Sequence, residues 1–518
     1  MHYRAANDEL AKRMTGEKRL FLDVRQSVSG VSWEHRLTER QDMIALAIAQ
    51  GYGVSDIVAR VLAGRGVTAE QTERFLDPTI RDLLPDPASL TDMDRAAARI
   101  AAAVMAREKV AIFGDYDVDG AASSALLKRF LTHFSVPSEI YIPDRIFEGY
   151  GPNPDAMREL VSRGATLIVT VDCGTNSAAS IDAANEAGAD VVVLDHHQVG
   201  GALPAAIAVV NPNRDDDLSG QGHLCAAGVV FLALVQTARI LRSRMADATP
   251  PDLLSLLDIV ALATVCDVVP LTGVNRAFVV KGLQMARQQK NEGLAALARV
   301  SRIGEPISTF HLAYLIGPRI NAGGRIGDAA LGSRLLATDD ARMPAVAGGD
   351  DDSRAIAGLI VKGGGHGMAA GITVERARLG ELRAFFEERA AADVFRLQGE
   401  ESLAIDGALA AEGATLSLLD ALEQAGPFGA GHVAPVFALP RHRLADARPV
   451  GTNHIRVELQ SESGGRIQAI AFRAVDTALG EFLFKNRGKT IHVAGSLSGN
   501  YWNGNRTVQF RITDAARA

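Results

Sequence analysis

The stretch VAIFGDYDVDG, from Val110 to Gly120, decides how the rest of the chain is interpreted. Its first four residues are apolar, which predicts a buried strand of a parallel sheet, and the segment after Gly120, AASSALLKRFLTHF, predicts a helix. Between strand and helix, Asp115, Asp117 and Asp119 stand at alternate positions. Carboxylates confined in this way repel one another unless a cation lies among them. Asp and Gly also form ordinary turns and helix N-caps, so both interpretations of this segment are kept.

The same strand-then-helix pattern recurs along the chain. TLIVTVDCGTN predicts a strand that ends at Asp172, and ADVVVLDHHQVG predicts one that ends at Asp195, His196 and His197. Strands that alternate with helices indicate an α/β fold with a parallel, doubly wound sheet, whose strand C-termini share one edge. Ligands bind at that edge. We therefore expect these acidic and imidazole groups to converge there.

A helical segment, DIVALATVCDVVPL, adds Asp267 to the candidates, although an Asp after a helix is more often a solvated terminus. Carboxylates alone suit Mg²⁺ or Ca²⁺, whereas imidazoles shift the preference towards Mn²⁺. The cysteines lack CxxC spacing, so a zinc site is not expected. The donors suffice for two ions, which points to hydrolysis of a phosphoester or phosphoanhydride.

The bulk composition bounds the remaining possibilities. A chain of 518 residues is expected to form two to four domains. Its three cysteines cannot form a disulfide framework, and the chain shows no signal peptide and no uninterrupted apolar stretch of membrane length, so a cytoplasmic location without membrane attachment is expected.

The charge is distributed unevenly. The net charge is −7, but residues 436–518 have 12 Lys and Arg against 6 Asp and Glu. A basic C-terminal module on an acidic body favours a polyanionic partner, although a basic module without a partner stays open. HIRVEL, RIQAIAF, TIHVAGSL and RTVQFRI alternate with a period of two, which predicts a small antiparallel β-barrel.

The motifs GDYDVDG, VDCG, LDHH and TVCDVVPL, in this order, resemble those of the DHH phosphoesterase superfamily. FLDP, EGYGPN, PRINAGGRIGDA (318–329), GGGHGMAAG (363–371) and GPFGAGH (426–432) are similar to the RecJ family of single-strand-specific exonucleases over nearly the whole chain. The resemblance implies a 5′-to-3′ exonuclease that releases mononucleotides from single-stranded DNA in repair and recombination, with Mn²⁺ or Mg²⁺ in a two-metal site. It also implies a monomer, with a single-strand-binding protein and a helicase as candidate partners.

The resemblance also implies roles for individual residues. Asp119, Asp172, His196 and His197 would be catalytic, and Asp172 would bridge two ions. Metal ligands would be drawn from Asp115, Asp117, Asp119, Asp172, His196, His197 and Asp267, with Asp115 a weaker candidate and Asp195 placed to orient a histidine. Arg319, Asn321 and Arg325, and then Gly364, Gly365 and His366, would hold substrate phosphates.

The resemblance further implies a domain order: a helical leader (1–90), a DHH domain (91–300), a connecting segment (301–349), a DHHA1-type α/β domain (350–435) and an OB-fold (436–518). In the OB-fold, the candidates for strand binding and base stacking are Arg456, Arg466, Tyr501, Trp502 and Arg506, although an aromatic residue in a small barrel often belongs to its core.

One departure from the family pattern matters for function. Only 37 residues separate Arg325 from Gly363, so the DHHA1-type domain is expected to be truncated. Two alternatives to the exonuclease therefore stay open. One is a DHH phosphodiesterase that acts on short oligonucleotides or small nucleotides, and the other is a single-strand-binding relative without activity.

Overall fold

The computed structural model describes residues 19–144, 148–149, 151–245, 248–323, 329–338, 359–366, 369–375, 380, 401–502 and 505–518, with backbone only for 323, 359–366, 369–375 and 502. The chain forms two compact units. We call Pro78–Arg378 with Pro427–His432 the sheet unit, and Met1–Asp77 with Leu379–Gly426 and Val433–Ala518 the barrel unit. Each is described by itself.

The sheet unit is built on a five-stranded parallel sheet in the order β3-β2-β4-β5-β6. The strands are β2 (Val110–Phe113), β3 (Ser138–Tyr141), β4 (Leu167–Val171), β5 (Asp190–Leu194) and β6 (Ala208–Val210). The order places β2, β4 and β5 side by side in the middle, with Phe113 opposite Thr170 and Val171 opposite Leu194. This confirms the predicted parallel α/β fold.

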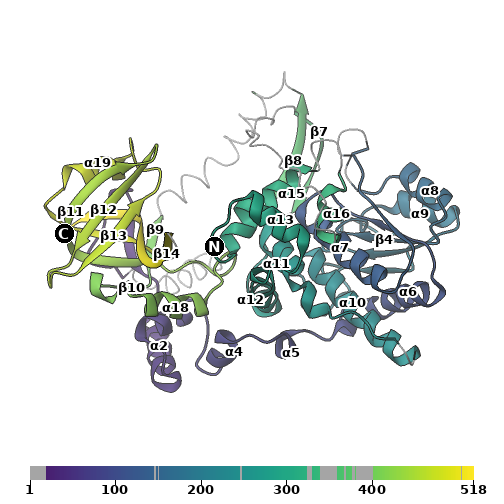
Figure 1. The fold of residues 1–518 in the computed structure, drawn as a ribbon, viewed down its shortest axis with the longest axis horizontal. Coiled ribbons are helices and arrows are strands. Elements are labelled where there is room, and N and C mark those ends of the chain that lie inside the picture. Colours follow the sequence, from purple (N-terminus) through teal and green to yellow (C-terminus); the bar gives the residue numbers. More distant parts are fainter. Residues whose placement is uncertain are drawn as a thin grey trace, which may run out of the picture. The chain divides into compact units, whose positions relative to one another are not determined.

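Helices cover both faces of this sheet (Figure 1). One face packs on α6 (Met93–Ala106), α7 (Val118–His133), α10 (Ala226–Arg244) and α11 (Leu257–Cys266). The other face packs on α8 (Pro154–Ser162) and α9 (Ala178–Glu186). Alternation along each strand decides the face, because Val110 and Ile112 enter the first core whereas Ala111 and Phe113 enter the second.

Among the described helices, α10 has the length and hydropathy of a membrane span, but 67% of that window is buried within the unit, as in the core helix of a globular protein.

The remaining elements of the sheet unit follow or flank this sheet. They are α5 (Ile80–Leu83), η1 (Pro87–Ser89), η2 (Leu253–Leu256), α12 (Gly273–Arg287), α13 (Glu292–Val300), α14 (Thr309–His311), the π-helical η3 (Leu312–Ile316), α15 (Gly317–Gly323) and α16 (Leu331–Ala337). Of the expected DHHA1-type region, the structure describes an antiparallel pair, β7 (Leu359–His366) with β8 (Ala369–Glu375).

The barrel unit contains a closed barrel in the order β11-β12-β13-β15-β14, because β11 pairs with both β12 and β14. Its strands are β11 (Phe437–Val450), β12 (His454–Gln460), β13 (Arg466–Ala471), β14 (Thr490–Trp502) and β15 (Asn505–Arg517), with α19 (Ala478–Lys485) between β13 and β14. Ile455, Val457 and Leu459 point into the core at every second position. The predicted small β-barrel is therefore confirmed. Its neighbouring strands are antiparallel except β13 and β15, which pair in parallel.

The N-terminal segment shares a core with this barrel, which the periodicity did not predict. Strand β1 (Ser32–His35) pairs in parallel with β9 (Ser402–Ile405), and the buried Trp33 Nε1 donates to Asp514 Oδ2 at 2.9 Å. The unit also contains α2 (Glu39–Tyr52), α3 (Asp56–Ala63), α4 (Thr72–Leu76), β10 (Gly407–Ala408), η5 (Ala411–Gly413) and α18 (Leu416–Ala425). The predicted domain boundaries stay a prediction.

A buried ion-pair cluster links the two parts of this core. Asp406 has no exposed side-chain surface, pairs with Arg36 Nε at 3.1 Å and with both outer nitrogens of Arg65, and accepts from the Val436 N–H at 2.9 Å. Arg65 is also buried, with 3% of its side chain exposed. A buried charge without its partner would have neither water nor an opposite charge to stabilise it, which is costly. The cluster therefore holds the N-terminal segment, with Arg36 and Arg65, against the later segment that contains Asp406.

We expect Asp406→Ala to destabilise the barrel unit by about 3 kcal/mol, because it leaves two guanidinium groups without their carboxylate. Thermal unfolding followed by circular dichroism measures the change. Asp446→Ala is the matched control, because Asp446 pairs with Arg448 at the surface and such pairs contribute about 0–1 kcal/mol. Equal shifts for the two variants would contradict this account.

Candidate metal centre

The C-terminal ends of β2, β4 and β5 bring the predicted acidic and imidazole groups together. Three overlapping groups have donor atoms within 4.8 Å of one another: Asp172, His196 and His197; Asp119, His196 and Asp267; and Asp115, Asp117 and Asp172. All seven metal-ligand candidates therefore belong to one cluster, although about 150 residues of chain separate Asp115 from Asp267.

The loop after β2 is held in shape by its own backbone. Asp115 accepts from the Tyr116 N–H at 2.8 Å, and Asp117 is the N-cap of α7, accepting from the Gly120 N–H at 3.0 Å. A Cβ atom at Gly120 would lie 2.5 Å from the Asp115 carbonyl oxygen. Only glycine fits there, so the turn that spaces the three aspartates depends on this close approach.

Asp119 is held from a distant part of the chain. Its two carboxylate oxygens accept from the N–H groups of Ala226 at 2.6 Å and Ala227 at 2.8 Å, the first residues of α10, and only 1% of the residue is exposed. A helix N-terminus favours negative charge. Burial nevertheless raises the pKa of Asp119, and Asp117 raises it further, against the opposing effect of His196.

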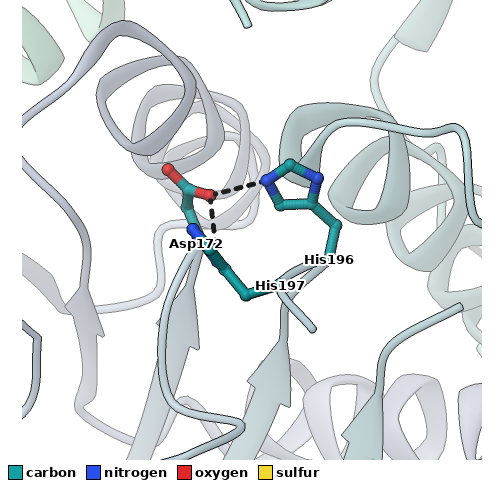
Figure 2. A group of neighbouring side chains, drawn as sticks. All are labelled: Asp172, His196 and His197. Carbon is teal, nitrogen blue, oxygen red and sulfur yellow. Dashed lines mark ion pairs between the residues drawn. The ribbon is translucent and has the colours of Figure 1, made fainter. Parts of the chain in front are cut away.

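Asp172 occupies a strained position in the middle of the cluster. Its φ of 59° is in the left-handed region, which Asp tolerates better than most residues. Its Oδ1 atom is buried without a hydrogen-bond partner among the described residues and lies 3.3 Å from His196 Nε2 and 3.9 Å from His197 Nδ1 (Figure 2). Burial, and then the charges of Asp119 and Asp117, raise the pKa of Asp172 well above its usual value.

The two histidines are oriented by their backbone surroundings. His196 Nδ1 lies 3.1 Å from the Leu224 carbonyl oxygen, so this nitrogen is the donor, and Nε2 faces Asp172 and Asp119. His197 Nδ1 lies 2.7 Å from Asp195 Oδ1. Such second partners fix the tautomer of a metal-binding imidazole.

Asp195 forms a hydrogen-bonded support below the two rings. Besides His197 Nδ1 it accepts from the N–H groups of His196 at 2.8 Å, His197 at 3.2 Å and Thr175 at 3.0 Å. Burial alone would raise the pKa of Asp195, but these donors and the imidazoles hold it well below its usual range. In turn, Asp195 overcomes the effect of burial and raises the pKa of His197 to about 9.

Asp267 completes the cluster as the C-cap of α11, and its Oδ2 atom lies 3.8 Å from His196 Nδ1. Burial, together with Asp119 and Asp117, raises its pKa to about 8. Residues Pro427–His432, from the GPFGAGH motif, contact the chain just beyond Asp267, where the Leu271 N–H donates to the Ala430 carbonyl at 2.9 Å. The motif was noted in the sequence, but its spacing does not indicate this contact.

The donor set fits divalent cations. Three features are those expected of a site built around positive charge. The carboxylates are crowded and have raised pKa values, Asp172 Oδ1 is buried without a hydrogen-bond partner among the described residues, and an imidazole nitrogen of His196 faces it. Thiolates are not part of it, because burial raises the pKa of Cys173 and Cys225 well above the usual value and that of Cys266 to about 12. Oxygen and imidazole donors suit Mn²⁺ and Mg²⁺.

The predicted phosphate-binding residues are only partly described. Arg319 Nη1 donates to the Leu315 carbonyl at 2.6 Å, whereas Arg319 Nε and Asn321 Oδ1 are buried atoms without a hydrogen-bond partner among the described residues. Arg325 and the side chain of His366 lie outside the described residues. Gly364 and Gly365 lie in β7, opposite Gly371 and Ala370 of β8.

On the barrel, the predicted contact residues are largely engaged with neighbours. Arg466 pairs with Glu458 at 2.9 Å, and Arg456 donates to Gln468 at 3.1 Å. Arg506 pairs with Asp420 at 2.5 Å and Glu423 at 2.6 Å and lies over the Tyr501 ring. The side chain of Trp502 lies outside the described residues.

A different aromatic side chain is exposed on the barrel. Phe472 is 49% exposed, Arg511 lies over its ring at 5.6 Å, and the His454 ring packs against its edge. The alternation in RIQAIAF, which buries Ile467, Ala469 and Ala471, already puts Phe472 outside.

Comparison with known proteins gives the site a context. Residues 109–264 match the DHH family, N-terminal domain, and residues 405–514 match the RecJ OB domain. The single-stranded-DNA-specific exonuclease RecJ of Dickeya dadantii is 31% identical, over 88% of this chain and 95% of that protein. The exonuclease of the same name from Escherichia coli is 29% identical over the same shares.

A solved structure extends the likeness to three dimensions. RecJ from Thermus thermophilus in complex with Mn²⁺ matches 94% of this chain and 79% of its own, with a TM-score of 0.72 and 25% identity. The alignment with the Dickeya protein spans 556 positions although the chain has 518 residues, so that relative has segments this chain lacks.

The cluster makes the metal-free protein sensitive to pH. Because the pKa of Asp267 is about 8 in the fold, against 3.8 for an unperturbed aspartate, the folded protein binds this proton more tightly than the unfolded chain does. The contribution of the protonated Asp267 carboxyl group to the free energy of unfolding is therefore present at low pH and lost as the pH rises from about 4 to about 8. In EDTA, we expect the melting temperature of the wild type to fall more steeply over that range than that of Asp267→Asn. Parallel curves would contradict the assignment.

Proposed function

Because the chain belongs to the RecJ family of single-stranded-DNA-specific exonucleases, we propose that it hydrolyses single-stranded DNA, using Mn²⁺ or Mg²⁺, and releases mononucleotides from the 5′ end. The observation that supports this most strongly is the buried carboxylate–imidazole cluster at the ends of β2, β4 and β5. In the cell we place this activity in DNA repair and recombination in the cytoplasm, and the three free cysteines fit a reducing compartment. A monomer that works with a single-strand-binding protein and a helicase remains part of the proposal.

We assign the cations to Asp117, Asp119, Asp172, His196, His197 and Asp267, with Asp115 as a further candidate. When bound, they would neutralise charge on the phosphoryl group and lower the pKa of an attacking water. The α10 amides keep the Asp119 carboxylate in one orientation, and Asp195 keeps the His197 ring in one tautomer. Arg319 and Asn321, each with a buried polar atom that lacks a partner among the described residues, are the described candidates for holding substrate phosphate.

A second activity is favoured by one observation. The alignment with the Dickeya relative spans more positions than this chain has residues, so this chain lacks segments of that relative. We propose that the DHHA1-type domain is the shortened part, which would weaken selection for long strands. An enzyme for short oligonucleotides would hydrolyse a dinucleotide as fast as a long strand. A relative without activity would bind single strands but release no nucleotide. The basic charge of the barrel favours the exonuclease that acts on long strands, because a basic domain binds the backbone of a strand.

Substitution of two aspartates distinguishes a residue that binds the cations from one that orients a histidine. We expect Asp119→Asn to abolish Mn²⁺-dependent nucleotide release from an end-labelled single strand, because it removes a charge that faces the cations. Asp195→Asn should lower the rate by about 10–100-fold, because His197 loses its partner while the ligand set stays complete. Asp446→Asn, at the barrel surface, is the control and should be unchanged. Full activity in Asp119→Asn would refute the site assignment.

A further inference from the structure

Two aromatic side chains of the sheet unit are exposed next to each other. Phe310, on α14, is 54% exposed, and Tyr314, on η3, is 67% exposed. Their ring centroids lie 5.1 Å apart at an interplanar angle of 35°. Large apolar rings are normally buried, so an adjacent exposed pair indicates a surface that meets something flat and apolar.

The helix that bears Tyr314 packs with its buried side against the end of α11, next to Asp267. Leu312 and Ile316 of η3 are fully buried, and the Leu312 carbonyl accepts from Cys266 Sγ at 3.4 Å. Cys266 directly precedes Asp267, a member of the cluster. One helix, about 10 Å in diameter, therefore separates the rings from the chain that presents Asp267. A π-helical turn such as η3 is rare and is frequently found at functional sites.

Two exposed arginines lie on the segment that packs against η3. The end of α13 packs on η3, where Ser301 Oγ lies 3.5 Å from the Leu315 carbonyl. On either side of Ser301, Arg299 and Arg302 are exposed, and neither guanidinium has an ion pair within the part of the chain that the structure describes. The nearby carboxylate of Glu305 is already engaged by His311 Nε2 at 3.0 Å. The Ser301–Leu315 contact puts Arg299 and Arg302 on a segment that packs against the helix bearing Tyr314. Exposed rings and exposed guanidinium groups are the groups that bind the bases and phosphates of a single strand.

We propose that Phe310 and Tyr314 form a base-stacking surface for single-stranded DNA, and that Arg299 and Arg302 hold the adjacent phosphates. This rests on the proposed function, since it assigns part of the path by which that substrate reaches the metal centre. The surface lies wholly within the sheet unit, so it adds binding beyond that of the barrel. The alternative occupant of this surface is another protein docked on the same rings, and its binding would not need the two arginines.

The test is equilibrium binding of a fluorescent oligothymidine in EDTA, followed by anisotropy at several salt concentrations. Stacking is independent of salt, so Phe310→Ala/Tyr314→Ala should weaken binding about 10-fold for each ring while the slope of log K against log salt stays unchanged. Arg299→Ala/Arg302→Ala should instead reduce that slope, by about 0.7 for each lost phosphate contact. Tyr314→Phe keeps the ring and should bind as the wild type does.

Controls separate this surface from the rest of the account. Tyr52→Ala removes a 40% exposed ring from the barrel unit and should leave binding unchanged. Binding in EDTA needs no hydrolysis, so failure of the wild type to release nucleotides would refute the proposed function and leave the stacking test intact. The decisive variant is Phe310→Ala/Tyr314→Ala. Unchanged strand binding in that variant, as a protein-docking surface would give, or an equal loss in Tyr52→Ala, would overturn the proposal.

Discussion

Repulsion among buried carboxylates is the constraint on which the active edge of the sheet depends. Asp119 and Asp172 are each 1% exposed and Asp115 is 4% exposed. Burial, and then the mutual charges of the cluster, raise the pKa of Asp172 and Asp267. Such an arrangement is unfavourable for the protein alone and becomes favourable when cations lie among the oxygens. The fold keeps it in place at the cost of local stability, as is common at functional sites.

The supports of this cluster come from parts of the chain that are far apart in sequence. Asp119 is held by the first amides of α10, His196 by the Leu224 carbonyl and His197 by Asp195. Each of the three side chains is held by a different partner, and each remains turned towards the centre of the cluster. The candidate metal centre is therefore preorganised by the parallel sheet and by α10 together.

The sequence was sufficient for the parts of the fold that follow from periodicity and strand ends. The strand Val110–Phe113, the parallel α/β sheet and the antiparallel barrel were all predicted, and the structure brings Asp115, Asp172 and His196 to one edge because adjacent parallel strands must end there. Contacts made by backbone groups were not predictable, because the N–H groups of Ala226 and Ala227 have no signature in residue type. The pairing of β1 with β9 joins segments about 370 residues apart, which local patterns cannot indicate.

The central claim is that this cluster is a divalent-cation site. Titration of Mn²⁺ into EDTA-stripped protein, by calorimetry in two buffers of different ionisation enthalpy, tests it most directly. The account predicts saturable binding with release of protons, because carboxyl groups with raised pKa values must ionise to ligate the metal, and loss of that binding in Asp172→Asn. Absence of binding, or identical binding and proton release in Asp172→Asn, would contradict it.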